Sequence, residues 1–142
     1  MRAQRVPARR QWCLASGDPA AAVDARRAFR AELERHASAG SDLAGAELIF
    51  AELLANVVRH AAGPAEAFLR WRGSRATLTV VDGGGGFRGP PATTLPDPTA
   101  ERGRGLALVS ALAFAMRAGN RPGGGAYVFA VLPVHLASAL LG

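Results

Sequence analysis

The chain contains no lysine, and all 17 of its basic residues are arginine. A P-loop nucleotide site needs a lysine on the phosphates, a protein-kinase-like fold needs a lysine on a strand, and Schiff-base chemistry needs an amine. The sequence therefore excludes these three kinds of site. A single cysteine, Cys13, likewise excludes an internal disulfide and a metal site built from several cysteines.

Long apolar segments are also missing. The longest apolar run, 105–116, is too short to span a bilayer, and the basic N-terminus is not followed by the apolar segment of a signal peptide. We therefore expect a cytoplasmic protein that does not bind a membrane.

The formal net charge is +6, but the arginines are spread along the chain without a dense block or interleaved aromatics, so we expect no direct contact with nucleic acid.

The overall composition is typical of a globular domain. Of its 142 residues 49% are hydrophobic and 20% are charged, which is enough to build one hydrophobic core. We expect a loose N-terminal tail over 1–8 and a single domain over 9–142.

Apolar periodicity and turn residues predict the order β-α-α-β-β-loop-α-β-β. Asp18-Pro19 and Ser41-Asp42 are typical helix starts, and Gly73-Ser74 is typical of a tight turn between strands. The expected elements are a strand at 10–16, helices at 19–38 and 42–62, strands at 67–72 and 77–82, a helix running into a strand over 103–119, a strand at 126–133 and a short helix at 135–141. Paired strands and clustered helices predict an α+β fold, a two-layer α/β sandwich.

An aspartate ends an apolar strand and precedes four glycines in VVDGGGGF, residues 80–87. Strand alternation places Asp82 on the face of Leu78 and Val80, so its carboxylate points toward the core and needs a donor. An arginine or the backbone of the turn could supply that donor. The glycines also let a ligand approach the main chain closely, and a flat heterocycle with an exocyclic amine would satisfy the carboxylate.

A carboxylate and an amide lie one helical turn apart in ELLANVVRH, residues 52–60. Glu52 and Asn56 share one face of the expected helix. They could form a solvated surface pair. Alternatively, the amide oxygen of Asn56 is a suitable ligand for Mg²⁺, and the carboxylate of Glu52 could orient or deprotonate an attacking hydroxyl.

Two glycines flank an arginine where the next helix begins, in ERGRGLALV, residues 101–109. Free N–H groups at a helix N-terminus bind phosphate, and the guanidinium of Arg104 fits phosphate oxygens. Gly103-x-Gly105 taken alone is also an ordinary loop-to-helix junction.

The order and spacing of these three stretches resemble the GHKL ATPase superfamily, whose Bergerat fold is shared by type II topoisomerases, histidine kinases and mismatch-repair ATPases. Glu52 and Asn56 resemble its N box. The residues that resemble its two glycine boxes are Asp82, Gly84, Gly86, Phe87, Gly103 and Gly105. The resemblance covers about residues 10–133. Within the superfamily, ELLANVVRHA and the chain length are similar to bacterial anti-sigma factor serine/threonine kinases.

This resemblance implies a mixed, mainly antiparallel sheet covered on one face by helices, with ATP and Mg²⁺ as cofactors. It implies that Asp82 binds the adenine amine, that Asn56 holds the metal, and that residues 83–102 form the ATP lid. Glu52 would act as the base toward a serine or threonine hydroxyl, and Arg104 would stabilise charge. The other nucleotide contacts would come from Gly84, Gly86, Phe87, Gly103, Arg104, Gly105 and Leu106.

The function that the resemblance implies is phosphorylation of an anti-anti-sigma (STAS-type) partner and sequestration of a sigma factor, by what we expect to be a homodimer. The alternative is a nucleotide-dependent partner-switch binding module with negligible kinase activity. Glu52 favours the kinase, because nucleotide binding alone needs only Asn56 and Asp82. A dinucleotide-binding domain is disfavoured, since the glycine run leads into prolines and not into a helix. The chain departs from the family at Ala126, where a threonine often assists the adenine-site aspartate.

Overall fold

The computed structural model describes residues 6–14, 19–60, 64–82 and 104–137, with the backbone alone for 57–60 and 104–105. Its elements follow the expected order. They are β1 (Arg10–Leu14), α1 (Pro19–His36), α2 (Leu43–His60), β2 (Ala65–Arg72), β3 (Arg75–Asp82), α3 (Arg104–Leu112), β4 (Ala115–Asn120) and β5 (Ala126–His135). No helix in these ranges is long and apolar enough to cross a membrane.

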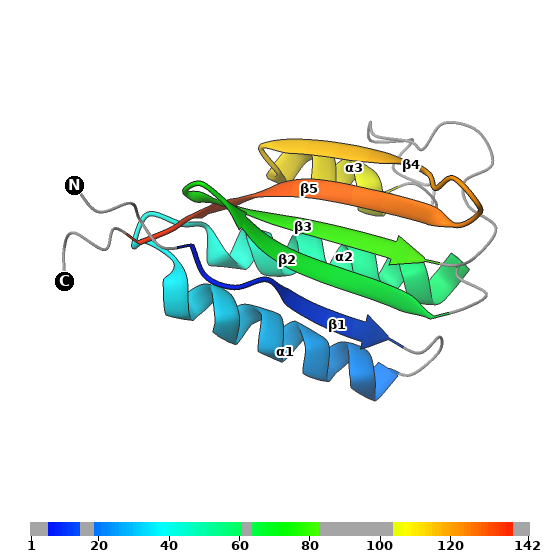
Figure 1. Cartoon of the computed structure of the whole chain (residues 1–142), viewed down its shortest axis with the longest axis horizontal. Helices are drawn as coiled ribbons and strands as arrows, with labels where there is room; N and C mark the ends of the chain where they lie inside the picture. Colours follow the sequence, from blue (N-terminus) through cyan, green and yellow to red (C-terminus); the bar gives the residue numbers. More distant parts are fainter. Residues whose placement is uncertain (1–5, 15–18, 61–63, 83–103, 138–142) are drawn as a thin grey trace.

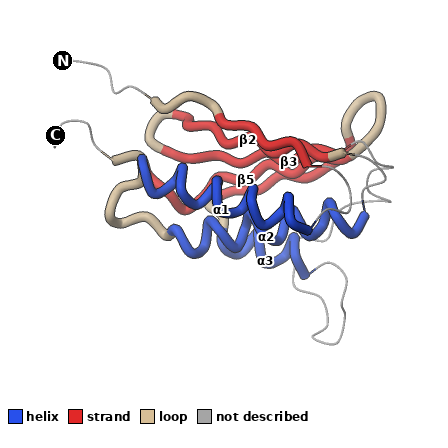
Figure 2. The backbone as a smooth tube through the Cα atoms, turned by 90° about the horizontal axis from the view of Figure 1, so that it is seen from below, coloured by secondary structure: helices blue, strands red, loops and turns tan. Residues whose placement is uncertain are grey.

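The strands form one five-stranded sheet in the order β1-β2-β3-β5-β4. Every pairing among the described strands is antiparallel. The helices lie side by side on one face of this sheet (Figures 1 and 2). The predicted fold class, an α+β sandwich of two layers with helices on one face, is confirmed.

The core fills the space between the sheet and the helices. Strand alternation points Leu69, Leu78 and Leu132 into it, and all three are fully buried. On α2, a broad apolar face is buried, and it contains Ala46, Ile49, Phe50, Leu53 and Leu54. The face is broad because α2 packs against α1 on one side, α3 on the other, and β3 and β5 above.

Three aromatic rings join the first strand to the first two helices. Phe29 of α1 and Phe50 of α2 are stacked with their centroids 4.2 Å apart, and neither is exposed to solvent. Trp12 of β1 meets both rings edge-on, at 6.1 and 5.8 Å. These contacts fix the α1–α2 pair under the edge of the sheet.

The start of α2 is capped as the sequence predicted. Oδ1 of Asp42 accepts a hydrogen bond from the backbone N–H of Gly45 at 2.9 Å, which satisfies one of the free donors of the first turn. The preceding loop is tied to the end of β5, because the N–H of Asp42 donates to the carbonyl of Pro133 at 2.9 Å.

The predicted helix at 135–141 is wrong at its start. His135 is the last residue of β5, and Leu136 forms a β-bridge with Ala37. The N–H of Leu136 donates to the carbonyl of Ser74 at 2.7 Å, and the N–H of Ala137 donates to His36 at 2.7 Å. These backbone bonds hold residues 136–137 extended between the β2–β3 turn at Ser74 and the end of α1 at His36. Residues 138–142 lie outside the described part.

Candidate functional site

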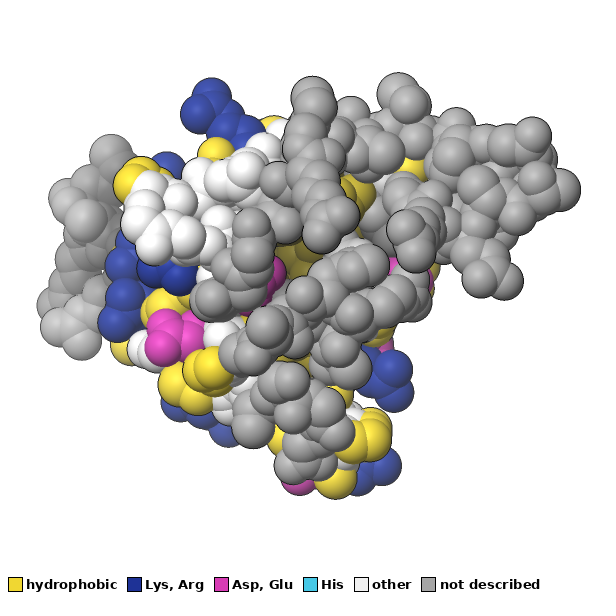
Figure 3. Space-filling model, turned by 90° about the vertical axis from the view of Figure 1, so that its right-hand side faces the viewer, with side chains coloured by type: hydrophobic (Ala, Val, Ile, Leu, Met, Phe, Trp, Pro, Cys, Tyr) yellow, Lys and Arg dark blue, Asp and Glu magenta, His cyan; other side chains and the backbone are white. Residues whose placement is uncertain are grey.

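Four segments meet at one end of the molecule, on the right in Figure 1: the last residues of β3, the C-terminal half of α2, the first turn of α3 and the turn between β4 and β5. Figure 3 looks directly at this end, where acidic side chains are visible among hydrophobic ones. The sequence assigned Asp82, Asn56 and Arg104 to three of these segments. The fold therefore brings the predicted motifs to the same end.

Asp82 is the last residue of β3 and is half-buried. The register that pairs Val81 with Tyr127 brings the first residue of β5 level with Asp82. As a result, the backbone N–H of Ala126 donates to Oδ1 of Asp82 at 3.3 Å. Nη1 of Arg121 lies 3.5 Å from the backbone oxygen of Asp82, so this contact is made to the main chain and not to the carboxylate.

The β4–β5 turn allows this approach because it is built from glycine. Gly123, Gly124 and Gly125 have φ angles of 86°, 114° and 89°, in the region that other residues rarely adopt. The N–H of Arg121 closes the turn by donating to the carbonyl of Gly125 at 2.8 Å. This tight reversal places the N–H of Ala126 beside the end of β3.

Glu52 and Asn56 lie one turn apart on α2, and both side chains are half-buried. Leu53 and Leu54 between them are buried in the core. The pair is therefore at the edge of the packed layer and not on a fully solvated face. A half-buried carboxylate and a half-buried amide oxygen can each approach a ligand with less competition from water.

The first turn of α3 begins at Arg104. Its N-terminus supplies the free backbone N–H groups that a phosphate requires. Leu106 is 5% exposed and its side chain belongs to the core, so any contact of this residue with a nucleotide would come from its backbone. The packing of Leu106 and Val109 anchors the helix and fixes the direction of its first turn.

Several predicted residues cannot be placed. Gly84, Gly86, Phe87 and Gly103 lie outside the described residues, as does the predicted lid at 83–102. Arg104 and Gly105 are described by their backbone alone. Their assigned roles stay predictions.

The chain matches the family model of the histidine kinase-like ATPase domain over residues 15–129. It belongs to this family. A comparison with curated proteins finds no match. The matched range contains Glu52, Asn56, Asp82 and the first turn of α3, so the histidine kinase-like ATPase domain includes every segment of the candidate site.

This domain is a GHKL-type ATPase domain, which binds ATP and supports ATP-dependent phosphotransfer. The described residues fit such a ligand. The half-buried carboxylate of Asp82, oriented by the N–H of Ala126, is a suitable acceptor for the exocyclic amine of adenine. The N-terminus of α3 is a suitable donor group for phosphate oxygens.

The sequence alone did not reveal two neighbours of Asp82, namely the N–H of Ala126 and the guanidinium of Arg121. The signal that could have found them is the RPGGG turn, which ends at Gly125. A tight turn there places Ala126 at the start of a strand, but only the strand order shows that this strand pairs with β3.

Proposed function

We propose that this domain is an ATP-dependent protein serine/threonine kinase of the anti-sigma factor type. In this proposal it transfers the terminal phosphoryl group of Mg-ATP to a serine or threonine of an anti-anti-sigma (STAS-type) protein, and it sequesters a sigma factor. The single observation that supports a kinase over a binding module is the presence of Glu52 one turn before Asn56, half-buried, on the helix that leads to the nucleotide end.

The proposed step is an in-line displacement. The carboxylate of Glu52 accepts the proton of the partner's hydroxyl as its oxygen attacks the γ-phosphorus, and the bond between that phosphorus and the bridging oxygen breaks to release ADP. Asn56 would hold the Mg²⁺ that neutralises charge on the phosphates. Arg104, at the N-terminus of α3, is the candidate for stabilising the charge that develops on the transferred group.

The test measures nucleotide binding and transfer separately. The chain is incubated with γ-labelled ATP, Mg²⁺ and a STAS-type protein from the same organism, and label on the partner is followed while ATP affinity is measured by calorimetry. We expect transfer by the wild type, binding without transfer by Glu52→Ala, and loss of both by Asp82→Ala. Normal transfer by Glu52→Ala would show that Glu52 is not the base.

A wild-type chain that binds ATP but labels no partner would favour the alternative, a nucleotide-dependent partner switch. Complex formation with a sigma factor, measured with and without ATP, then decides whether the switch is retained. If the chain forms the expected homodimer, light scattering will give a molar mass twice that of one chain.

A further inference from the structure

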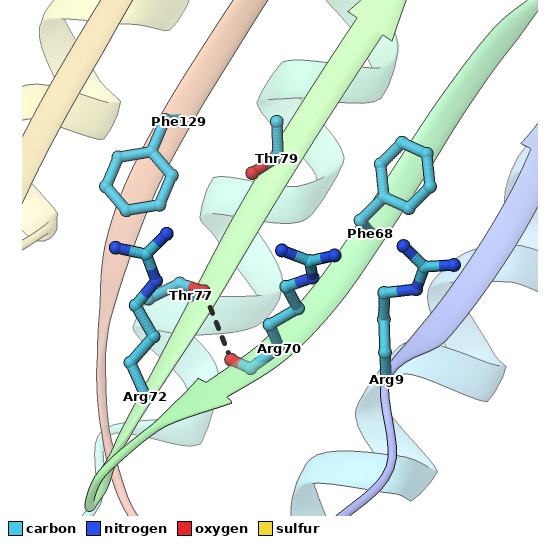
Figure 4. Close-up of a pocket in the computed structure, with 7 residues that line it drawn as sticks. All are labelled: Arg9, Phe68, Arg70, Arg72, Thr77, Thr79 and Phe129. Atoms are coloured by element: carbon cyan, nitrogen blue, oxygen red, sulfur yellow. Dashed lines mark hydrogen bonds between the residues drawn. The ribbon is translucent and has the colours of Figure 1, made fainter.

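In the part of the chain that the structure describes, the helices cover one face of the sheet and leave the opposite face without a second layer (Figure 2). Strand alternation turns Phe68, Arg70 and Arg72 of β2 toward this outer face. Together with neighbouring strands they form a hollow of about 220 Å³. The side chains that line it are Arg9, Phe68, Arg70, Arg72, Thr77, Thr79 and Phe129 (Figure 4).

Aromatic rings position the guanidinium groups in this hollow. Cζ of Arg9 lies 5.3 Å from the ring centroid of Phe68, and Cζ of Arg72 lies 5.7 Å from that of Phe129. The guanidinium of Arg70 lies between the other two, so the three form a row across the sheet (Figure 4). A guanidinium held near a ring is ordered by cation–π attraction, while its N–H groups can still donate to oxyanions.

Thr79 of β3 lies between the two rings, and Thr77 of the same strand lies between Arg72 and Arg70 (Figure 4). Thr77 is 3% exposed, and its hydroxyl donates to the backbone carbonyl of Arg70 at 3.2 Å. This bond ties the two strands together under the guanidinium row. Arg70 and Arg72 therefore stand on a strand that is paired on both sides, whereas Arg9 lies directly before β1.

Among the described residues, the ion pairs lie on the helix side of the molecule and not on the outer face. Within the described ranges, ion pairs join Glu32, Glu34 and Glu47 to cations of β1 and α1. No carboxylate among the described residues forms such a pair with Arg9, Arg70 or Arg72. Arg117 of β4, paired in register with Phe129, extends the positive face toward the far edge of the sheet.

We propose that this outer face binds an acidic segment of a partner protein, whose carboxylates are held by Arg9, Arg70 and Arg72. A second copy of the chain is disfavoured as the occupant, because it would bring the same arginines into contact. Among the outward-facing residues of the described strands, Glu66 is the single acid available to offset them.

A single-stranded nucleic acid fits this face less well than a carboxylate-rich polypeptide. Base stacking needs an open ring face, whereas Phe68 and Phe129 are half-buried and each already has a guanidinium beside it. Carboxylates need only the N–H groups at the edges of the guanidinium row. The proposal does not rest on the proposed function, since Asp82 points to the opposite side of the sheet by strand alternation.

The test uses the full chain and a short fluorescein-labelled polyglutamate peptide, with binding followed by fluorescence anisotropy at low salt. We expect measurable binding that weakens as salt is added, and a loss of roughly fivefold or more in the R70Q/R72Q variant. The matched control is R26Q/R27Q, which removes the same formal charge from exposed positions on α1 and should change the affinity by less than about twofold.

Equal weakening by the two double substitutions would overturn the proposal, because net charge alone would then explain the binding. So would the absence of measurable binding to the wild type. A labelled oligouridylate of equal charge that binds more tightly than the peptide would contradict the choice of a protein partner. A second pair, R9Q/R117Q, should weaken peptide binding like R70Q/R72Q, which guards against a folding defect specific to β2.

Discussion

The backbone N–H of Ala126 donates a hydrogen bond to Oδ1 of Asp82 across 3.3 Å, from the strand that pairs with its own. The sequence resemblance places a threonine at this position in many related domains. Here the donor is the peptide group, so the orientation of the carboxylate does not depend on a side chain at position 126. Although Ala126 has no hydroxyl, the carboxylate of Asp82 therefore still has a hydrogen-bond donor at this position.

A substitution that removes this N–H should weaken nucleotide binding, whereas one that keeps it should not. We expect Ala126→Gly to bind ATP within about threefold of the wild type, and Ala126→Pro to lose roughly tenfold, because proline has no N–H to donate. Isothermal titration with ATP measures both, and far-UV circular dichroism confirms that each variant is folded. A folded proline variant with wild-type affinity would show that the bond has no role in binding.

The effect of Mg²⁺ on ATP affinity should depend on Asn56. If the amide oxygen of Asn56 is a Mg²⁺ ligand, Asn56→Ala should bind ATP roughly tenfold more weakly than the wild type when Mg²⁺ is present. Its ATP affinities with Mg²⁺ and with EDTA should then differ little. Affinity in EDTA should change little, because the adenine contact at Asp82 remains. The matched control is Asn120→Ala, an exposed residue at the end of β4, which should retain the full magnesium effect. An unchanged magnesium effect in Asn56→Ala would exclude it as a ligand.

The stacked rings of Phe29 and Phe50 should account for a large part of the free energy of unfolding. Truncation of the fully buried Phe29 to alanine leaves a cavity under Trp12, and we expect a loss of about 3–5 kcal/mol. Val23, on the same helix and 40% exposed, provides the control: Val23→Ala should cost less than about 0.5 kcal/mol. Urea denaturation measures both. Similar losses in the two variants would contradict the aromatic packing.

The sequence was sufficient for features that depend on local chemistry. Asp42 caps α2 as predicted, because a carboxylate before an apolar helix has a local donor to satisfy. Gly73-Ser74 forms the turn of the β2–β3 hairpin as predicted, because glycine readily adopts the φ of 58° that Gly73 has there. The inward position of Asp82 also follows from strand alternation alone.

Features that depend on strand order could not be derived in the same way. The sequence FLRWR already places Phe68, Arg70 and Arg72 on one face of a strand. It cannot show that Arg9 and Phe129 come to lie beside them, because these residues belong to separate segments that only the sheet brings together. His135 was likewise assigned to a helix, since its pairing with Arg75 is invisible to local periodicity.

Calorimetric titration of ATP and GTP into the wild type and Asp82→Asn measures whether Asp82 receives the exocyclic amine of adenine. The wild type should prefer ATP, because guanine presents a carbonyl where adenine presents an amine. Asp82→Asn should bind ATP roughly 10- to 100-fold more weakly and lose this preference, while Asp24→Asn, exposed on α1, should match the wild type. Wild-type ATP affinity and preference in a folded Asp82→Asn chain would show that the Asp82 carboxylate does not bind the adenine amine.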